Sequence, residues 1–423
     1  MKSSSNPRVL ILSNTPFYLS DSNGRALGLL LKGIPNKEKI QFCIQGSVIS
    51  AELIDQCYRI TDMDILWGVF KSSINAYGMP KDVSTGSYKK TTRKRVKRTP
   101  FSMLLRDMAW KTKMKKTDFF SIASNFQPDI VLWQLGDSGF MAELAICLSR
   151  NSNAKLVVYS TEDYYFKDWN YLSRGKKGFV YPFFYRGMRS SIKKAMTYSS
   201  LCICNTPQLA YRFRSEFDIQ TEVIMQSAND VASFGSDLKD NNTIMYAGNL
   251  GLNRHDSLIK IARALYKIDP VFRLEVYGYA SEAVKKAFLI EPNIIYKGFV
   301  SYEMVVQRIH SVRLLVHAES FDPFFQKDLK AAFSTKIPDS LASGTPLFLF
   351  APDGLAETQY LKDNSCAFVC SDIESLESAL ALALKDDARR AQVLYNSVAV
   401  VHSNHNLVNN QKHMLHLLKS IIS

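Results

Sequence analysis

The chain has 423 residues, a formal net charge of +14 and a hydrophobic fraction of 46%. This length exceeds what one ordinary core accommodates, so we expect two domains, and the hydrophobic fraction excludes an intrinsically disordered protein. Because no apolar run reaches the roughly 18 residues of a membrane-spanning helix, and the N-terminal run is too short for a signal peptide, we expect a cytoplasmic protein.

Short apolar runs alternate with amphipathic segments along the chain. The strands expected in the first half are residues 8–13, 40–44, 129–133, 155–160, 201–205 and 222–226. Those expected in the second half are residues 243–248, 273–278, 293–298, 313–318, 346–351 and 367–370. Helical patterns lie between them. This alternation predicts an α/β fold of two doubly wound, Rossmann-like domains, in which helices cover both faces of parallel sheets.

The alternation pauses at the polar residues 227–242, which we interpret as the domain linker. We therefore expect an N-terminal domain over residues 1–228 and a C-terminal domain over residues 229–403. Residues 404–423 form one further amphipathic helix after the last strand.

A basic stretch spans residues 78–120 and contains 13 Lys or Arg against three Asp. This density is typical of a segment that binds an anionic partner, although a solvated loop is the alternative. Nucleic acid and an acidic membrane surface both qualify as that partner. The charges that we expect to make the contact are Lys89, Lys90, Arg93, Lys94, Arg95, Lys97 and Arg98.

Three cations stand where a helix begins after an expected strand, namely Arg25, Arg254 and Lys336. Ligands of open parallel sheets bind at this edge, where the strands end. The helix dipole disfavours an exposed cation there by about 0.3–1 kcal/mol, unless a bound anion reverses the sign. We therefore predict that Arg254 and Lys336 hold a diphosphate, with ordinary surface residues as the alternative. Small or polar residues precede the three cations: Gly24, Gly248, Asn249, Ser334 and Thr335.

Several common site motifs are missing from the sequence. It contains no G-x-G-x-x-G fingerprint and no P-loop, which argues against a dinucleotide dehydrogenase and an NTPase. The seven Cys include no C-x-x-C pair and no His at zinc-ligand spacing. We therefore expect free thiols and no metal site.

The second half resembles the donor-binding half of GT-B glycosyltransferases over residues 242–385. The motifs that carry the resemblance are MYAGNLGLNRHDSLIKIARAL, FRLEVYG and FSTKIPDSLASGTPLFLF. They are closest to the glycosyltransferase family four group of bacterial polysaccharide transferases. In the first half, the opening strand, the SNGR turn and the strand-helix layout match.

The resemblance implies a nucleotide-sugar in the C-terminal domain, with a UDP-sugar favoured, and an acceptor in the N-terminal domain. It implies no cofactor and no obligatory metal, and it implies that the last helix crosses back to the N-terminal domain. The family's second donor-site Glu, which contacts the ribose, falls on Asp339, whereas its first falls on Ala331. Glu319, Asp322 and Asp328 are the alternatives for the lost acid. Tyr277 and Gly278 are expected to shape the base pocket.

Acids at the ends of two N-terminal strands are candidates for the acceptor side. Where the family often has a His, the sequence offers Gln134 and Asp137, and YSTEDYYFKDW supplies Glu162 and Asp163. Helix capping is the alternative role for these acids. The resemblance implies retention, which needs no classical base, whereas inversion requires a group that takes the acceptor proton.

Three function classes remain after these observations. We favour a glycosyltransferase of bacterial surface polysaccharide synthesis that acts on a lipid-linked saccharide, because the basic stretch then binds anionic lipid at the inner face of the membrane. A nucleotide-sugar epimerase of the same fold needs neither membrane nor acceptor. A basic nucleic-acid-binding protein is disfavoured, since residues 88–98 contain only one aromatic residue and no RNA- or DNA-binding signature appears.

Overall fold

A computed structural model describes residues 6–19, 21–68, 71–82, 98–173, 175–176, 178–228 and 240–422. The chain divides into two compact units. The N-terminal unit consists of Met1–Met225 together with Val408–Ser423, and the C-terminal unit is Gln226–Leu407. Among the described residues, no helix is both long and apolar enough to cross a membrane.

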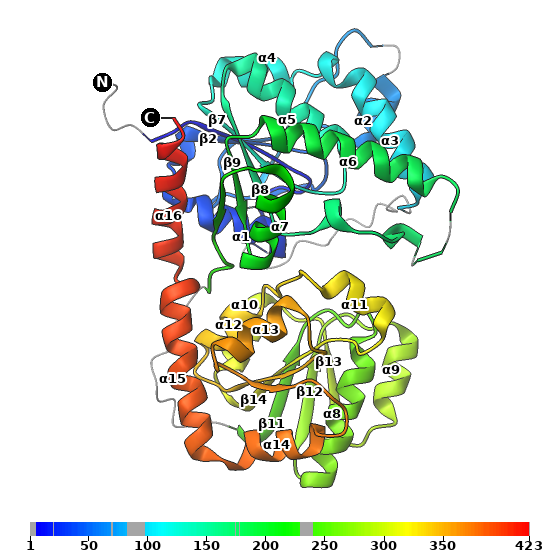
Figure 1. Ribbon diagram of the computed structural model, residues 1–423, viewed down its shortest axis with the longest axis vertical. Helices are drawn as coiled ribbons and strands as arrows, with labels where there is room; N and C mark the ends of the chain where they lie inside the picture. Colours follow the sequence, from blue (N-terminus) through cyan, green and yellow to red (C-terminus); the bar gives the residue numbers. More distant parts are fainter. Residues whose placement is uncertain are drawn as a thin grey trace. The chain divides into compact units, whose positions relative to one another are not determined.

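The N-terminal unit is built on an eight-stranded sheet in the order β10-β9-β8-β7-β1-β2-β4-β5 (Figure 1). All neighbours are parallel except β4 and β5. The strands are β1 (Val9–Ser13), β2 (Lys39–Cys43), β4 (Cys57–Arg59), β5 (Tyr77–Gly78), β7 (Ile130–Gln134), β8 (Lys155–Ser160), β9 (Leu201–Cys204) and β10 (Thr221–Val223). A separate parallel pair is formed by β3 (Ile49–Ser50) and β6 (Lys81–Asp82).

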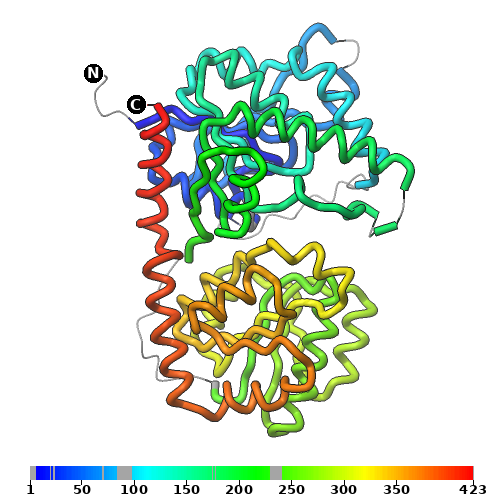
Figure 2. The backbone as a smooth tube through the Cα atoms, viewed as in Figure 1, coloured from blue at the N-terminus to red at the C-terminus, as the bar shows by residue number. Residues whose placement is uncertain are grey.

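Both faces of this sheet are apolar, because successive strand residues point to opposite sides. Leu10 and Val131 face one core, which the helices α2 to α7 cover. Val9 and Ile130 face a second core, which α1 and the C-terminal helix α16 cover. Figure 2 shows α16 beside the first segments of the chain, and Gln411 Nε2 of α16 donates to the backbone carbonyl of Leu29 at 2.7 Å. The helices are α1 (Ser22–Leu30), α2 (Asp62–Trp67), α3 (Pro100–Lys113), α4 (Phe119–Phe126), α5 (Gly139–Ser152), α6 (Tyr181–Tyr198), α7 (Pro207–Phe217) and α16 (Leu407–Ser420).

The C-terminal unit contains a six-stranded parallel sheet in the order β13-β12-β11-β14-β15-β16. Its strands are β11 (Asp240–Ala247), β12 (Arg273–Tyr277), β13 (Ile294–Gly298), β14 (Val312–Ala318), β15 (Leu347–Phe350) and β16 (Phe368–Cys370). Its helices are α8 (Arg254–Ile268), α9 (Glu282–Leu289), α10 (Tyr302–Ile309), α11 (Pro323–Leu329), α12 (Ile337–Ala342), α13 (Ala356–Asp363), α14 (Leu376–Lys385) and α15 (Asp387–Asn404). Leu258 of α8 and Leu380 of α14 pack in one core with Ile244 and Val316 of the sheet.

The α/β fold class with two doubly wound sheets is confirmed. Each of the twelve expected strands is present, with ends that differ by up to three residues. The four short strands β3 to β6 were not expected, because two or three residues are too few to form an apolar run.

Candidate functional site

The strand order of the C-terminal sheet reverses between β11 and β14, its first and fourth strands. These strands are hydrogen-bonded neighbours, with Ile244 opposite Leu314. The strand β11 is followed by the turn into α8, and β14 is followed by the turn at Glu319. In open α/β sheets the ligand binds at such a switch point, outside the carboxyl ends of the strands. A ligand-binding site is therefore expected at these two turns.

The turns after β11 and β12 touch each other through glycine. The amide of Gly248 donates to the carbonyl of Tyr277 at 3.0 Å. A Cβ on Gly278 would stand 2.0 Å from the carbonyl oxygen of Gly248, and Gly278 has a φ of +145°. Only glycine fits at position 278, because any side chain would both clash and strain the backbone. The Tyr277 hydroxyl donates a hydrogen bond to Glu275 Oε2 at 2.9 Å.

Arg254 is the first residue of α8, as predicted, and it meets a carboxylate there. Its Nε and Nη2 donate to the two oxygens of Glu319, both at 2.7 Å. Glu319 is 1% exposed and Arg254 14% exposed, so this bidentate pair is almost buried. The Nη1 edge of the guanidinium points to the backbone oxygen of Asn249 at 3.5 Å. Glu319 thus supplies an anion for Arg254, so the position of this cation at the helix start does not by itself require a bound phosphate.

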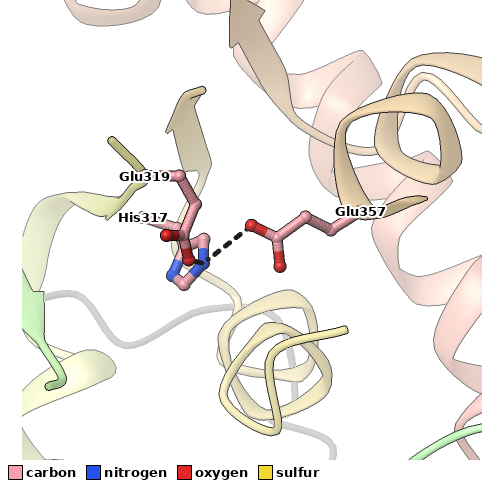
Figure 3. A group of neighbouring side chains, drawn as sticks. All are labelled: His317, Glu319 and Glu357. Atoms are coloured by element: carbon pink, nitrogen blue, oxygen red, sulfur yellow. Dashed lines mark hydrogen bonds and ion pairs between the residues drawn. The ribbon is translucent and has the colours of Figure 1, made fainter. Parts of the chain in front are cut away.

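His317 lies between Glu319 of this ion pair and a second carboxylate (Figure 3). Its Nε2 lies 3.3 Å from Glu319 Oε1 and 3.2 Å from Oε1 of Glu357 in α13. Burial alone would lower the pKa of His317, but Glu357 and Glu319 outweigh it and raise the pKa to about 9. Burial opposes the charge of Glu319, yet His317 and Arg254 bring its pKa below the usual value. Two cations thus balance two carboxylates in one buried network.

The network continues to the segment before α12. The amide of Ser334 donates to Glu357 Oε2 at 3.2 Å. Ser334 and Thr335 are of the residue types that favour the N-cap position, but α12 begins at Ile337 and its N-cap is Lys336. The Ser334 hydroxyl accepts from the Lys336 amide at 3.4 Å instead, which shifts the helix start by one residue or more. Asp339, in the first turn of α12, accepts from the Tyr302 hydroxyl at 3.0 Å.

The candidates for the lost donor-site acid differ in their surroundings. Glu319 lies beside Arg254, whereas Asp322 caps α11 by accepting from the amide of Phe324 at 2.9 Å. Ala331 is buried. Glu357 was not among the predicted site residues, because it follows Ala356 at the start of α13 and carries no motif of its own. Only its spatial position beside His317 reveals it.

Asp137 lies at the corresponding edge of the N-terminal sheet, after β7. The strand order of this sheet reverses between β1 and β7. Asp137 is 5% exposed, forms an ion pair with Arg98, and accepts from the Tyr171 hydroxyl at 3.3 Å. Burial is the main reason that the pKa of Tyr171 is raised, and Asp137 adds to it.

Asp163 belongs to the same neighbourhood. It lies 3.5 Å from Lys167 Nζ and 3.2 Å from Arg212 Nη1. The Lys167 ammonium in turn lies within 6 Å of three aromatic rings, one of which is Tyr171 at 5.6 Å. The structure thus links Asp163 to Asp137 through Lys167 and Tyr171. Glu162 is half-buried beside Asp163.

The remaining predicted site residues lie elsewhere in the N-terminal unit. Gly24 and Arg25 are in the first turn of α1, after β1. A Cβ on Gly24 would stand 2.4 Å from the carbonyl oxygen of Pro16, so the helix start packs closely on the preceding loop. Arg98 is described, whereas Lys89, Lys90, Arg93, Lys94, Arg95 and Lys97 lie outside the described residues.

One group of side chains in the described part of the chain has the composition of a metal site. The ligand atoms of His317, Glu319 and Glu357 lie within 4.8 Å of one another. A divalent cation at this position would displace the proton of His317 and compete with Arg254, because the charges of the network already balance. All seven Cys are free thiols.

Comparisons with known proteins agree with this architecture. Residues 230–398 match the family model of glycosyl transferases group 1. HepE from Anabaena in complex with UDP has a TM-score of 0.62 at 13% identity, over 98% of this chain and 100% of that chain. Sucrose-phosphate synthase from Thermosynechococcus elongatus has a TM-score of 0.62 at 11% identity, over 98% and 99%. A UDP-forming α,α-trehalose-phosphate synthase from Burkholderia xenovorans has a TM-score of 0.60 at 12% identity, over 99% and 100%. None of the curated proteins matches the sequence.

Two doubly wound units with this likeness over their full length define the GT-B fold. Together, the fold and the family match support a GT-B glycosyltransferase, and the matching segment lies in the C-terminal unit. A grouping with family four is consistent with these findings but is not specified by them.

Proposed function

We propose that the protein transfers a sugar, with retention, from a UDP-sugar to a lipid-linked saccharide in bacterial surface polysaccharide synthesis. The observation that carries the proposal is the buried Arg254–Glu319 pair at the switch point of the C-terminal sheet. In this proposal the C-terminal unit binds the donor and the N-terminal unit binds the acceptor. HepE was solved with UDP-glucose, which supports the choice of donor.

The donor site uses Arg254 and Lys336 to bind the diphosphate. Glu319 holds two donor groups of Arg254 and thereby fixes the guanidinium, whose Nη1 edge lies toward the turn at Asn249. The amides at the start of α8 add a favourable dipole for the phosphates. Because the leaving diphosphate gains negative charge during transfer, both cations stabilise the transition state more than the bound donor.

The other proposed donor contacts surround this diphosphate site. Asp339 accepts hydrogen bonds from the ribose, and Tyr277 and Gly278 border the base. The remaining donor-side residues of the C-terminal unit are Gly248, Asn249, Ser334 and Thr335, whereas the predicted donor residues Gly24 and Arg25 belong to the N-terminal unit.

The acceptor side uses Asp137, Glu162 and Asp163. Arg98 pairs with Asp137, and Lys167 and Arg212 pair with Asp163, which holds these carboxylates in place as hydrogen-bond acceptors for sugar hydroxyls. The lipid-linked acceptor places the protein at the inner face of the membrane, where the basic stretch binds anionic lipid.

A turnover assay tests the proposal directly. UDP-, GDP- and dTDP-sugars are incubated with the protein and with lipid-linked saccharides, and released nucleotide and product are measured. We expect release of UDP that depends on the acceptor. Conversion of the sugar without nucleotide release would indicate an epimerase and would contradict the proposal.

Variants at and just before the start of α12 test the donor site. Lys336→Ala should lower turnover by about 100-fold while it weakens donor binding much less, because its charge acts in the transition state. Asp339→Ala should chiefly weaken donor binding. Lys330→Ala is the matched control, since Lys330 is an exposed lysine of the same segment. Equal turnover of Lys336→Ala and Lys330→Ala would exclude a catalytic contribution of Lys336.

A further inference from the structure

The helix α3 carries a row of apolar side chains on its outer surface. Phe101, Leu105 and Met108 are 59%, 47% and 57% exposed. Their spacing of four and three residues places them on one side of the helix, over two successive turns. An amphipathic helix normally buries such a row against a core. An exposed row of this kind marks an interaction surface.

The opposite side of α3 is fixed by polar contacts. Trp110 Nε1 and Arg106 Nε both donate to Asp62 of α2, at 2.8 and 3.0 Å. On another side, Asp107 accepts from the amide of Gly139 at the start of α5, at 3.0 Å. The helix therefore cannot rotate to bury its apolar row without breaking these bonds.

The neighbouring helix α2 extends the apolar surface. Its Met63, Leu66 and Trp67 are exposed, and Trp67 is the most exposed of the three at 75%. Lys113 of α3 donates to the backbone carbonyl of Ile65 at 3.1 Å, so the two helices lie side by side. Scattered apolar residues are common on protein surfaces, but six large ones on two packed helices are not.

The charges of these helices favour an anionic partner. The exposed Lys115 and Lys116 follow α3 directly. The acids of the two helices are engaged with the protein: Asp62 with Arg106, Asp64 with the amide of Thr61, and Asp107 with Gly139. A second copy of this chain would bring the same positive charges against them, whereas anionic lipid supplies both opposite charge and an apolar interior.

We propose that α2 and α3 form a membrane-docking face that inserts Phe101, Leu105, Met108 and Trp67 into an anionic bilayer. This inference rests on the proposed function, which places the acceptor on a lipid. The chain connects this face to the proposed acceptor side, which supports an acceptor carried by lipid. Arg98 lies two residues before α3 and forms an ion pair with Asp137 of the acceptor side. Docking by this face therefore places the acceptor residues next to the lipid surface.

Flotation with liposomes of phosphatidylcholine and phosphatidylglycerol tests the insertion. Leu105→Ser/Met108→Ser should weaken binding tenfold or more. The matched control is Leu289→Ser/Ile290→Ser, which removes two exposed apolar side chains of the C-terminal unit and should leave binding unchanged. Wild-type binding should also persist in part at about 0.5 M NaCl, where charge attraction alone is screened. Melting temperatures confirm that both variants fold.

Fluorescence quenching by brominated acyl chains provides a second measurement. We expect quenching with wild type and a clear loss of it with Trp67→Phe, since Trp110 and Trp133 are fully buried and Trp169 is partly buried. Equal flotation of the two double variants, or no quenching, would overturn the inference. Conversion of a dimer to a monomer by Leu105→Ser/Met108→Ser would assign the face to a second copy and overturn it as well. Nucleotide release from UDP-sugar in solution is measured in parallel, so that failure of the proposed function is seen separately.

Discussion

Because Arg254 and Glu319 form a buried pair, a substitution at either residue is expected to affect the stability of the protein. A cation at a helix start is unfavourable by itself, but here the buried carboxylate requires it. Removing one partner of a buried pair leaves the other charge unpaired, which costs about 3–5 kcal/mol. The pair therefore contributes to stability as well as to the proposed donor site.

We expect Arg254→Met and Glu319→Gln each to lower the free energy of unfolding by about 3 kcal/mol. The double variant should lose less than the sum, because neither charge is then left alone. Urea unfolding of the four proteins measures this coupling. Losses that add within about 0.5 kcal/mol would show that the two residues act independently.

His317 makes the stability depend on pH. Its folded pKa of about 9 lies above the ordinary value of 6.5, so the charged form is stabilised in the folded protein. The groups that face it are Glu319 at the end of β14, Glu357 of α13 and, through Glu319, Arg254 of α8. This stabilisation is complete below about pH 6.5 and disappears as the pH rises through about 9.

Accordingly, the stability difference between wild type and His317→Gln should shrink as the pH rises from about 6.5 to 9, by on the order of 3 kcal/mol. His416→Gln is the control, because His416 is exposed on α16. Chemical unfolding at a series of pH values gives the two curves. A difference that stays constant over this interval would mean that His317 is not charged in the folded protein.

Among the helices and strands, those that a local sequence pattern determines could be predicted from the sequence. The strand Leu347–Phe350 is a continuous apolar run, so its place in a buried parallel sheet follows from periodicity. The start of α12 does not follow in this way, because contacts of Ser334 with Glu357 compete with the helix. The partners within the buried network could not be predicted either, since Glu319 lies 65 positions from Arg254 and Glu357 lies 40 positions from His317 along the chain.

The close contact of Gly278 with Gly248, between the turns after β11 and β12, should contribute to the stability of the fold. Gly278→Ala should lower the free energy of unfolding by about 3 kcal/mol, through both backbone strain and the clash with Gly248. Gly298→Ala is a matched control, since Gly298 also has a positive φ but a Cβ there meets nothing within 4 Å. We expect it to cost about 1 kcal/mol. Equal losses in thermal or urea unfolding would show that the close approach does not matter.

For the whole molecule, the position of the positive charges, and not only their sum, should determine how strongly the protein is attracted to anionic surfaces. Replacing Lys89, Lys90, Arg93, Lys94, Arg95 and Lys97 with Gln should weaken binding to anionic liposomes, by up to about 1 kcal/mol per charge at low salt. Arg98→Gln is tested separately, because Arg98 also pairs with Asp137.

The control for this prediction removes the same charge elsewhere. It replaces six exposed lysines with Gln, namely Lys37, Lys286, Lys327, Lys330, Lys385 and Lys412. We expect this control to bind anionic liposomes more tightly than the variant of the basic stretch. If the two bind equally, total charge and not its position governs the attraction.

The two-part composition of the N-terminal unit has a consequence for its synthesis on the ribosome. Residues Gln226–Leu407, 182 in number, emerge between Met225 and the helix α16 that completes the unit. At about 5–20 residues per second, this interval lasts roughly 10 to 40 seconds. During that time the sheet face lined by Val9 and Ile11 lacks Met414, Leu417 and Leu418, which later cover it. The nascent chain therefore exposes an apolar surface throughout this part of its elongation, and chaperones that bind apolar segments have that long to reach it.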